Sequence, residues 1–465
     1  SDSSVDLLKF PIPLGTILPA FGYLTFDETD FNPTPLTPGP KDFALSGSHG
    51  DSVWLVVGNA TGTGVERFVD HVDFGGTFNG VSLARLPDGT GRLAPAAQPS
   101  LGAPNGPFAT SEIVITEINY HPDQPSAAAV AIDPTIVASD LEFVELHNHS
   151  AAAVDLTNWR LRGESDFDFA AGRFVAPGAT LVVVPFDPQI PLNADRLAAF
   201  RNHYGIDASV VLVGPMLPSL SNNFGLIKLQ KPDMAPVDEP TVVPRVLVDE
   251  VLYDDLSPWP QAADGTGESL QRKRPTTLGN DAVSWRALPP TPGTARYEVQ
   301  VESITINGGD TTRSAATSVA VVFDAPGNTP QAAFAVTNLT TNQQVTSLTV
   351  QTTTTGDKTT ALLTFDPGSS VIGRAVGGNT LADGYYQLTI LASGITAQSG
   401  DAAMDDNVTF GDQATDLFFR KFGDHDGNDL VNLFDFAAFR GTFGKSSGAA
   451  GYLNDMDGDG NGVID

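Results

Sequence analysis

The sequence predicts a mainly β protein, in which tandem β-sandwiches are followed by a small α-helical module. Short runs rich in Val, Thr, Leu and Phe are separated by Pro, Gly, Asn and Asp, which is the pattern of strands and turns in β-sandwiches. Long helical patterns are scarce, and the tail from residue 420 onward combines a helical apolar spacing with loops rich in Asp and Asn. At 465 residues, the chain has the length of about three domains.

The composition excludes several classes of function. Asp and Glu number 55 against 25 Lys and Arg, which gives a formal charge of −30. Such a surface repels phosphate backbones and anionic membranes, so we expect no nucleic-acid partner. No apolar run is long enough to span a bilayer. The absence of Cys excludes disulfide bonds and zinc sites with thiolate ligands.

Two stretches near the C-terminus have the spacing of EF-hand-type calcium loops. Such a 12-residue loop offers oxygen ligands from positions 1, 3, 5, 7, 9 and 12, position 7 through its backbone carbonyl. In the first loop these positions are Asp424, Asp426, Asn428, the Leu430 carbonyl, Asn432 and Asp435. In the second loop positions 1, 3, 5, 7 and 9 are Asp457, Asp459, Asn461, the Val463 carbonyl and Asp465, and position 12 would lie past Asp465. A single loop of this kind is often a solvated turn, but two in series predict Ca²⁺ binding.

This pairing resembles the type I dockerin family, in which two calcium loops are each followed by a short helix. The resemblance covers residues 423–465 and includes Asp at position 12 of the first loop. The Phe residues at 436, 439 and 443 recur at helical spacing, which predicts a short amphipathic helix between the loops. The resemblance implies calcium binding and a protein partner for this module, cohesin-like or a second copy of the chain.

Four positions of the first loop besides its ligands bear on the resemblance. Asp429 replaces the usual turn glycine, and Asp tolerates the left-handed conformation required there. Leu433 and Phe434 occupy positions 10 and 11, where cellulosomal dockerins often present a hydroxyl pair to cohesin. Position 8 is Val431, which we expect to tuck the loop against its partner.

An internal repeat divides the first 300 residues. Residues 51–56, 69–74 and 80–87 parallel residues 224–229, 248–253 and 267–275 in the same order. The second copy has additional opening strands, Ile113–Pro122, Leu141–Asn148 and Val154–Leu161. Each of them contains an acidic residue, and the last also contains Trp159. We therefore expect one partial copy of a sandwich at residues 1–107 and one complete copy at residues 112–296.

The complete copy resembles the lamin-tail domain family, an immunoglobulin-like sandwich that is common in secreted bacterial proteins. The matching segments are the strands just described and Trp259–Leu270. Because the first copy lacks the opening strands, the backbone edges of its sheets are unpaired. We expect an upstream segment or a neighbouring chain to pair with them. The sequence begins Ser1-Asp2-Ser3 without Met, so we expect a processed or partial product, and secretion is inferred from the domains.

A third sandwich and the tail complete the predicted order of domains. Residues 297–419 contain four strand patterns, and Asp383-Gly-Tyr-Tyr386 resembles the turn and tyrosine of an immunoglobulin-like sandwich. Residues 420–465 form the dockerin-like module. The fold class is thus tandem immunoglobulin-like β-sandwiches followed by a small EF-hand module.

The sequence contains no convincing catalytic constellation. No G-x-S-x-G, H-E-x-x-H, P-loop or G-x-G-x-x-G motif occurs in the strand–helix setting that such chemistry requires. Glu142 and Glu145 lie three apart on one strand, so they face opposite sides, and we expect hydrogen-bonding roles with a cation site as the alternative. Trp259 and Trp285 lie near Pro-rich turns and are the better surface candidates, which leaves a carbohydrate ligand open.

We therefore expect a non-enzymatic, secreted bacterial protein that acts in scaffolding or adhesion at the cell surface. Two alternatives stay open at this point. The chain is an accessory region of a larger extracellular enzyme, polysaccharide-degrading or kinase-like, or it is a subunit of a fibre assembled head to tail.

Overall fold

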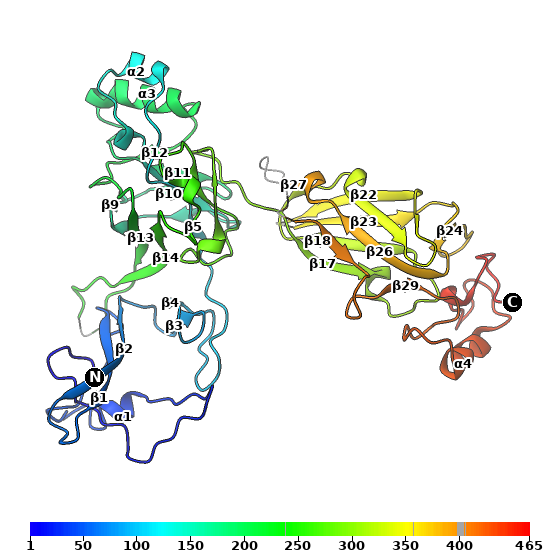
Figure 1. Cartoon of the computed structure of the whole chain (residues 1–465), viewed down its shortest axis with the longest axis horizontal. Coiled ribbons are helices and arrows are strands. Elements are labelled where there is room, and N and C mark those ends of the chain that lie inside the picture. Colours follow the sequence, from blue (N-terminus) through cyan, green and yellow to red (C-terminus); the bar gives the residue numbers. More distant parts are fainter. Residues whose placement is uncertain (238, 357, 398–403, 405) are drawn as a thin grey trace. The chain divides into compact units, whose positions relative to one another are not determined.

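The period-two patterns form strands that pair into sandwiches, as the computed structural model shows for residues 1–237, 239–356, 358–397, 404 and 406–465 (Figure 1). The chain divides into two compact units, Ser1–Ala295 and Arg296–Asp465. None of the helices in the described residues combines the length and hydrophobicity that a membrane span requires.

Unit 1 contains a sandwich of a six-stranded and a four-stranded sheet. Its strands are β5 (Ile113–Asn119), β6 (Phe143–Asn148), β8 (Arg160–Gly163), β9 (Phe167–Asp168), β11 (Thr180–Val183), β12 (Leu212–Val213), β13 (Phe224–Pro232), β14 (Arg245–Asp254), β15 (Ser269–Arg272) and β16 (Trp285–Leu288). The sheet orders are β12-β11-β6-β5-β15-β16 and β14-β13-β8-β9. A small third sheet pairs β7 (Val154–Asp155) with β10 (Phe174–Val175). The sandwich core lies between the two larger sheets and includes Ile115, Leu146, Leu229 and Val251.

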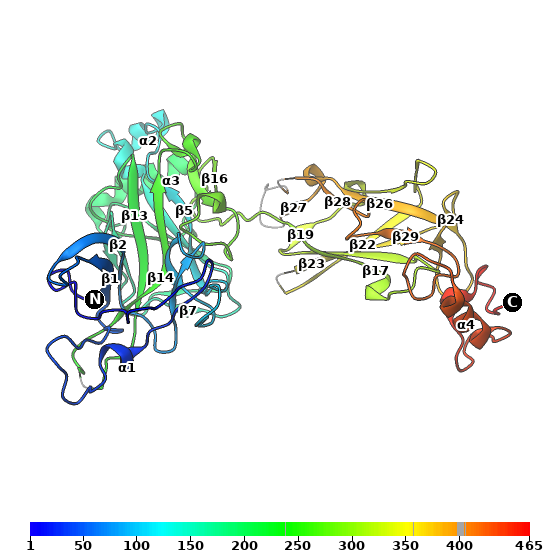
Figure 2. The same ribbon diagram turned by 60° about the horizontal axis from the view of Figure 1, so that its bottom comes forward.

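Two helices cover the other face of the six-stranded sheet. These are α2 (Ala127–Ile132) and α3 (Ala194–Tyr204), which lie side by side in both views (Figures 1 and 2). Phe200 of α3 is fully buried against Phe143 and Phe186. Helix α3 therefore contributes to a second, smaller core.

The first hundred residues form hairpins and contribute to none of the clusters of buried apolar residues in the described part of the chain. They contain α1 (Glu28–Phe31) and the antiparallel pairs β1 (Asp51–Gly58) with β2 (Val65–Phe74) and β3 (Leu83–Leu86) with β4 (Arg92–Pro95). The hydrophobic clusters of the described residues begin at Ile113. Many large apolar side chains before residue 107 are exposed, among them Leu14, Phe21 and Phe68. The β1–β2 hairpin corresponds in the repeat to the β13–β14 hairpin.

Unit 2 contains a second complete sandwich. Its larger strands are β17 (Val301–Ile306), β18 (Ser318–Phe323), β20 (Phe334–Asn338), β22 (Leu348–Thr355), β23 (Lys358–Phe365), β26 (Gly384–Ile390), β28 (Val408–Phe410) and β29 (Phe418–Arg420). The short ones are β19 (Gly327–Asn328), β21 (Gln343–Gln344), β24 (Val371–Ile372), β25 (Thr380–Leu381) and β27 (Thr396–Ala397). One sheet has the order β17-β18-β23-β22, and the other the order β21-β20-β26-β28, with β29 also on β26. The Tyr386 hydroxyl donates to the Ala382 carbonyl at 2.7 Å, as a tyrosine at this type of turn does.

The C-terminal tail packs within unit 2. Its helix α4 (Leu433–Thr442) is capped by Asn432, whose side chain accepts a hydrogen bond from the Phe434 N–H. Asp435 completes the capping box by accepting from the Asn432 N–H at 2.9 Å. Both residues were predicted calcium ligands, so the end of the first loop and the start of the helix share side chains.

Candidate metal centre

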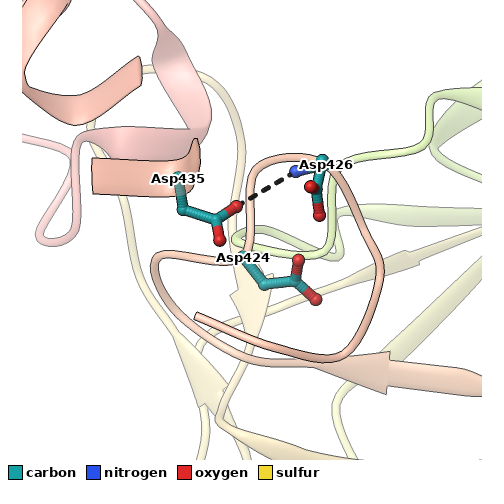
Figure 3. Close-up of side chains that lie close together, drawn as sticks. All are labelled: Asp424, Asp426 and Asp435. Carbon is teal, nitrogen blue, oxygen red and sulfur yellow. Dashed lines mark hydrogen bonds between the residues drawn. The ribbon is translucent and has the colours of Figure 1, made fainter. Parts of the chain in front are cut away.

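Three carboxylates of the first loop converge. Asp424, Asp426 and Asp435 each offer one oxygen atom, and these atoms lie within 4.8 Å of one another (Figure 3). Asp424 and Asp435 are buried, whereas Asp426 is exposed. A buried group of hard oxygen donors is the chemistry that Ca²⁺ prefers.

Local hydrogen bonds give the first loop its shape. Asp424 accepts from the N–H of Gly427 at 2.9 Å through Oδ1 and from the N–H of Asp429 at 3.0 Å through Oδ2. Asp426 Oδ1 accepts from the Asn428 N–H at 3.1 Å, and Asn428 Oδ1 accepts from the Leu430 N–H at 2.9 Å. These contacts bend the backbone into a ring around Asp424. Asn432 remains close to the ring, since its Nδ2 donates to the Leu430 carbonyl at 3.3 Å.

The second loop repeats this pattern position by position. Asp457 accepts from the N–H of Gly460 and of Gly462, each at 2.9 Å. Asp459 Oδ1 accepts from the Asn461 N–H at 3.1 Å, and Asn461 Oδ1 accepts from the Val463 N–H at 2.7 Å. Two loops 33 residues apart (424 to 457) therefore adopt one conformation. Asp465 is exposed, and among the described residues the second loop does not bring three acidic side chains together as the first does.

Burial and hydrogen bonding act differently on the two buried carboxylates of the first loop. Burial raises the pKa of Asp424, and the neighbouring carboxylates of Asp435 and Asp426 add to the effect. Burial also favours a higher pKa for Asp435, but donation from the N–H groups of Asn432, His425 and Asp426 outweighs it and lowers the pKa. The two buried carboxylates of the cluster thus have pKa values shifted in opposite directions.

Asp429 anchors the loop to the sandwich. Its backbone has φ 68°, the left-handed conformation that the missing turn glycine would supply. Its side chain accepts from the Tyr385 hydroxyl at 2.6 Å and pairs with the Lys421 ammonium. Tyr385 belongs to β26, so the residue that departs from the dockerin pattern links the first loop to the sandwich of unit 2.

Both loops are docked against loops of the sandwich. In the first, the Arg313 N–H donates to the Asp424 carbonyl at 2.9 Å. A Cβ added at Gly427 would lie 1.9 Å from the Thr311 carbonyl oxygen, so the close approach requires glycine. In the second, the Val376 N–H donates to the Gly460 carbonyl at 3.0 Å.

Asp455, which lies just before the second loop, forms hydrogen bonds with the first loop and with the sandwich. Its carboxylate accepts from the Thr312 hydroxyl at 3.0 Å and lies 2.7 Å from His425 Nδ1, while its carbonyl accepts from the Ser314 hydroxyl at 2.6 Å. Sequence reasoning missed Asp455 and Tyr385 because their partners are distant in the sequence, and it also missed the nearer pair of Lys421 with Asp429. The position of Asp455, two residues before Asp457 of the second loop, is the signal that could have pointed to it.

Helix α4 exposes an apolar surface. Phe434 is 80% exposed, and Leu433, Phe436 and Phe443 are exposed as well. The expectation for Val431 was wrong: it is 55% exposed, whereas its counterpart in the second loop, Ile464, is fully buried. Ile464 pairs with Lys445 through a backbone hydrogen bond of 3.0 Å instead of meeting Val431.

The remaining candidates have structural environments. Trp259 and Trp285, the better surface candidates among the Trp residues, are both buried in the unit 1 core, with ring centroids 6.3 Å apart. They cannot form a carbohydrate platform. Glu142 and Glu145 accept hydrogen bonds from the backbone N–H groups of Leu220 and Gly293, each at 2.7 Å, in agreement with the predicted hydrogen-bonding roles.

Comparisons with known proteins support one of the two resemblances. Residues 107–213, which include β5 to β12, match the model of the Lamin Tail Domain family, and they support a lamin-tail, immunoglobulin-like domain in this region. No curated protein matches the chain. Among solved structures, a DUF4876 family protein from Bacteroides thetaiotaomicron matches over 49% of this chain and 87% of its own, with 13% identity and a TM-score of 0.25, which is too low to support an inference.

Proposed function

We propose that the chain is a non-enzymatic, secreted structural protein. Its C-terminal module binds Ca²⁺ and attaches the chain to a protein partner. The convergence of Asp424, Asp426 and Asp435 is the observation that carries this proposal. The identical hydrogen-bond pattern of the two loops supports it, because a solvated turn has no reason to recur in the same form.

The first loop would hold Ca²⁺ through the side chains of positions 1, 3, 5, 9 and 12 and one backbone carbonyl. The donors are Asp424, Asp426, Asn428, Asn432, Asp435 and the Leu430 carbonyl. The second loop would contribute Asp457, Asp459, Asn461, Asp465 and the Val463 carbonyl. Ca²⁺ takes six to eight oxygen ligands, so water completes either set where the protein does not.

Titration of the full chain with Ca²⁺ by calorimetry tests this assignment. The expected result is saturable binding with a Kd on the order of 10⁻⁶ to 10⁻³ M. Asp424→Asn should weaken binding strongly, because it removes a charge from the centre of the first loop. Asp412→Asn, an exposed Asp outside the loops, is the matched control. Equal titrations of both variants would sink the assignment of the first loop.

The exposed apolar side chains of α4 favour attachment to a protein partner at this module. Leu433 and Phe434 occupy the positions that face cohesin in the family that the module resembles, and both are exposed. An apolar pair there suits a partner surface different from that of cohesins that contact hydroxyl side chains. The partner is a cohesin-like domain or a second copy of this chain.

The first 107 residues favour a second contact. Their exposed apolar side chains and the absence of a core cluster before Ile113 support a strand supplied by an upstream segment or a neighbouring chain. The second of these would produce head-to-tail fibres. Light scattering of the chain at increasing concentration, with and without Ca²⁺, tests self-association, and a strict monomer in all conditions excludes the fibre.

A further inference from the structure

A cavity of about 380 Å³ lies between the N-terminal hairpins and the outer face of the β13–β14 hairpin in unit 1. Its volume is within the range of small-molecule sites. The enclosing segments are connected by backbone pairing, because Gly76 forms a parallel bridge with Val246 at the start of β14. The Arg92 Nε also donates to Glu250 at 3.0 Å across the same junction. The cavity is therefore framed by two parts of the chain that are far apart in sequence.

The wall of this cavity is basic in a protein that is strongly acidic. Four cations line it, Arg85, Arg92, Lys228 and Arg245, against the two carboxylates of Asp73 and Glu250. The chain has only 25 Lys and Arg at a formal charge of −30. A local excess of positive charge in a concave, partly apolar site concentrates anions.

Arg85 and Glu250 have structural partners. Arg85 Nη2 donates to both oxygens of Asp70, at 2.9 and 3.2 Å, and so its charge is compensated outside the cavity. Glu250 is buried and accepts from Arg92 and from Asn280. These pairs hold the wall in place.

Three cations keep hydrogen-bond donors for a ligand. Among the described residues, Arg92 uses only Nε, and Arg245 uses only Nη1, which donates to the Asn158 carbonyl. The Lys228 ammonium lies 3.5 Å from Glu250, its one charged partner among these residues. Guanidinium groups with unused terminal nitrogens bind carboxylates through two parallel hydrogen bonds.

The rest of the wall is apolar. Phe78, Val81, Leu83 and Leu247 line it. The Lys231 ammonium lies 4.6 Å from the Phe78 ring centroid and 5.7 Å from that of Trp159, and so it connects Phe78 to a core residue. The cavity thus offers a charged side and an apolar side to the same ligand.

We propose that this cavity binds a small organic acid of about sugar size, whose single carboxylate contacts Arg92, Lys228 and Arg245. With Arg85 compensated by Asp70, the remaining three cations exceed the two wall carboxylates by one charge, which suits a monoanion. Polyanions are disfavoured by the charge of the whole chain. The ligand body lies against the Phe78 side of the cavity.

Calorimetric titration of the full chain with D-galacturonate, and with uncharged D-galactose at the same concentrations, tests the proposal. The expected result is saturable galacturonate binding that weakens as NaCl rises, with galactose binding at least about tenfold more weakly. Uronates also bind Ca²⁺, and such binding could be mistaken for binding in the cavity. Each titration is therefore repeated with chelator, in which galacturonate binding in the cavity is expected to persist. Absence of galacturonate binding in chelator overturns the proposal, whatever the result for the calcium loops.

Substitutions locate the site. The double variant Lys228→Gln/Arg245→Gln should lose binding by at least about tenfold, while Lys228→Arg retains it. Arg67→Gln removes one charge from an exposed position of β2 outside the cavity and is the control. Should the double variant fold poorly, chemical-shift changes of the wild-type chain on adding galacturonate must include Lys228, Gln230 and residues 245–247. Shifts confined elsewhere, or equal affinity of all variants, overturn the proposal.

Discussion

Glu117 on β5 and Glu145 on β6 are directly opposite each other, and both carboxyl groups are buried. Glu117 accepts from the Thr291 N–H at 3.0 Å, and Glu145 accepts from the Gly293 N–H at 2.7 Å. The two side chains therefore fix, through hydrogen bonds, the segment Thr291–Gly293, which leads out of the first unit. Burial raises the pKa of both, and the charge of Glu117 raises that of Glu145 further.

The stability of unit 1 should fall as the pH rises through the neutral range. A carboxyl group with a raised pKa binds its proton more tightly in the folded chain, so its contribution is full below the ordinary value of 4.5 and is lost as the pH rises through the folded value. Glu142, whose pKa burial raises to about 7, acts in the same direction. All four Trp residues lie before residue 296, so Trp fluorescence during urea unfolding reports on this unit alone.

Glu145→Gln should flatten this pH dependence. The amide keeps an acceptor for the Gly293 N–H and has no proton to lose, so the variant should be more stable than the wild type at pH 8 by about 1.4 kcal/mol for each unit of pKa shift removed. Burial lowers the pKa of His147 to about 4, which reduces stability on the acid side in both proteins. Glu66→Gln, at an exposed position, is the control. Identical slopes for the two variants would contradict the explanation.

Calcium should stabilise unit 2 as a whole and leave unit 1 unchanged. The loops are hydrogen-bonded to the sandwich through Arg313 and Val376, so an ion that binds only the folded loops also stabilises the domain on which they rest. At 100 times Kd the expected gain is about 2.7 kcal/mol. Calorimetric melting in Ca²⁺ and in chelator measures it, with Trp fluorescence as the internal control. Melting of the tail in a separate transition, with the sandwich unaffected, would contradict this coupling.

Asp429 should stabilise the docked loop through its side chain, not through its backbone conformation. Asp429→Gly keeps the left-handed conformation and loses the contacts with Tyr385 and Lys421, so unit 2 should lose about 1 to 3 kcal/mol. Tyr385→Phe removes the hydroxyl donor alone and should lose about 1 kcal/mol. A more stable Asp429→Gly variant would show that the conformational cost dominates.

Gly427→Ala should separate the loop from the sandwich. The added Cβ meets the Thr311 carbonyl, and overpacking of this kind costs about 1 to 3 kcal/mol. Gly448 also has positive φ, at 84°, but a Cβ there meets no atom within 4 Å. Gly448→Ala therefore measures the backbone cost alone. Equal loss of unit 2 melting temperature in the two variants would contradict the docking argument.

Local patterns in the sequence determined the elements of this protein. Period-two alternation located four strands of the second sandwich, β17, β18, β23 and β26, and missed β20, β28 and β29. The Asp and Asn spacing located two loops whose side chains accept from backbone N–H groups two to five residues away. Such contacts are short in sequence, so the residues themselves specify them. Calcium binding by these loops remains a prediction.

Tertiary structure alone decided how those elements meet. Asp429 and Tyr385 are 44 residues apart, and Arg92 and Glu250 are 158 apart, so no local spacing reports that they touch. The exposure of Val431 reversed an expectation for the same reason, and only the folded chain shows that the surface candidates Trp259 and Trp285 are buried. Whether an apolar side chain is covered depends on which distant strand or loop packs against it, and this is a property of the folded chain.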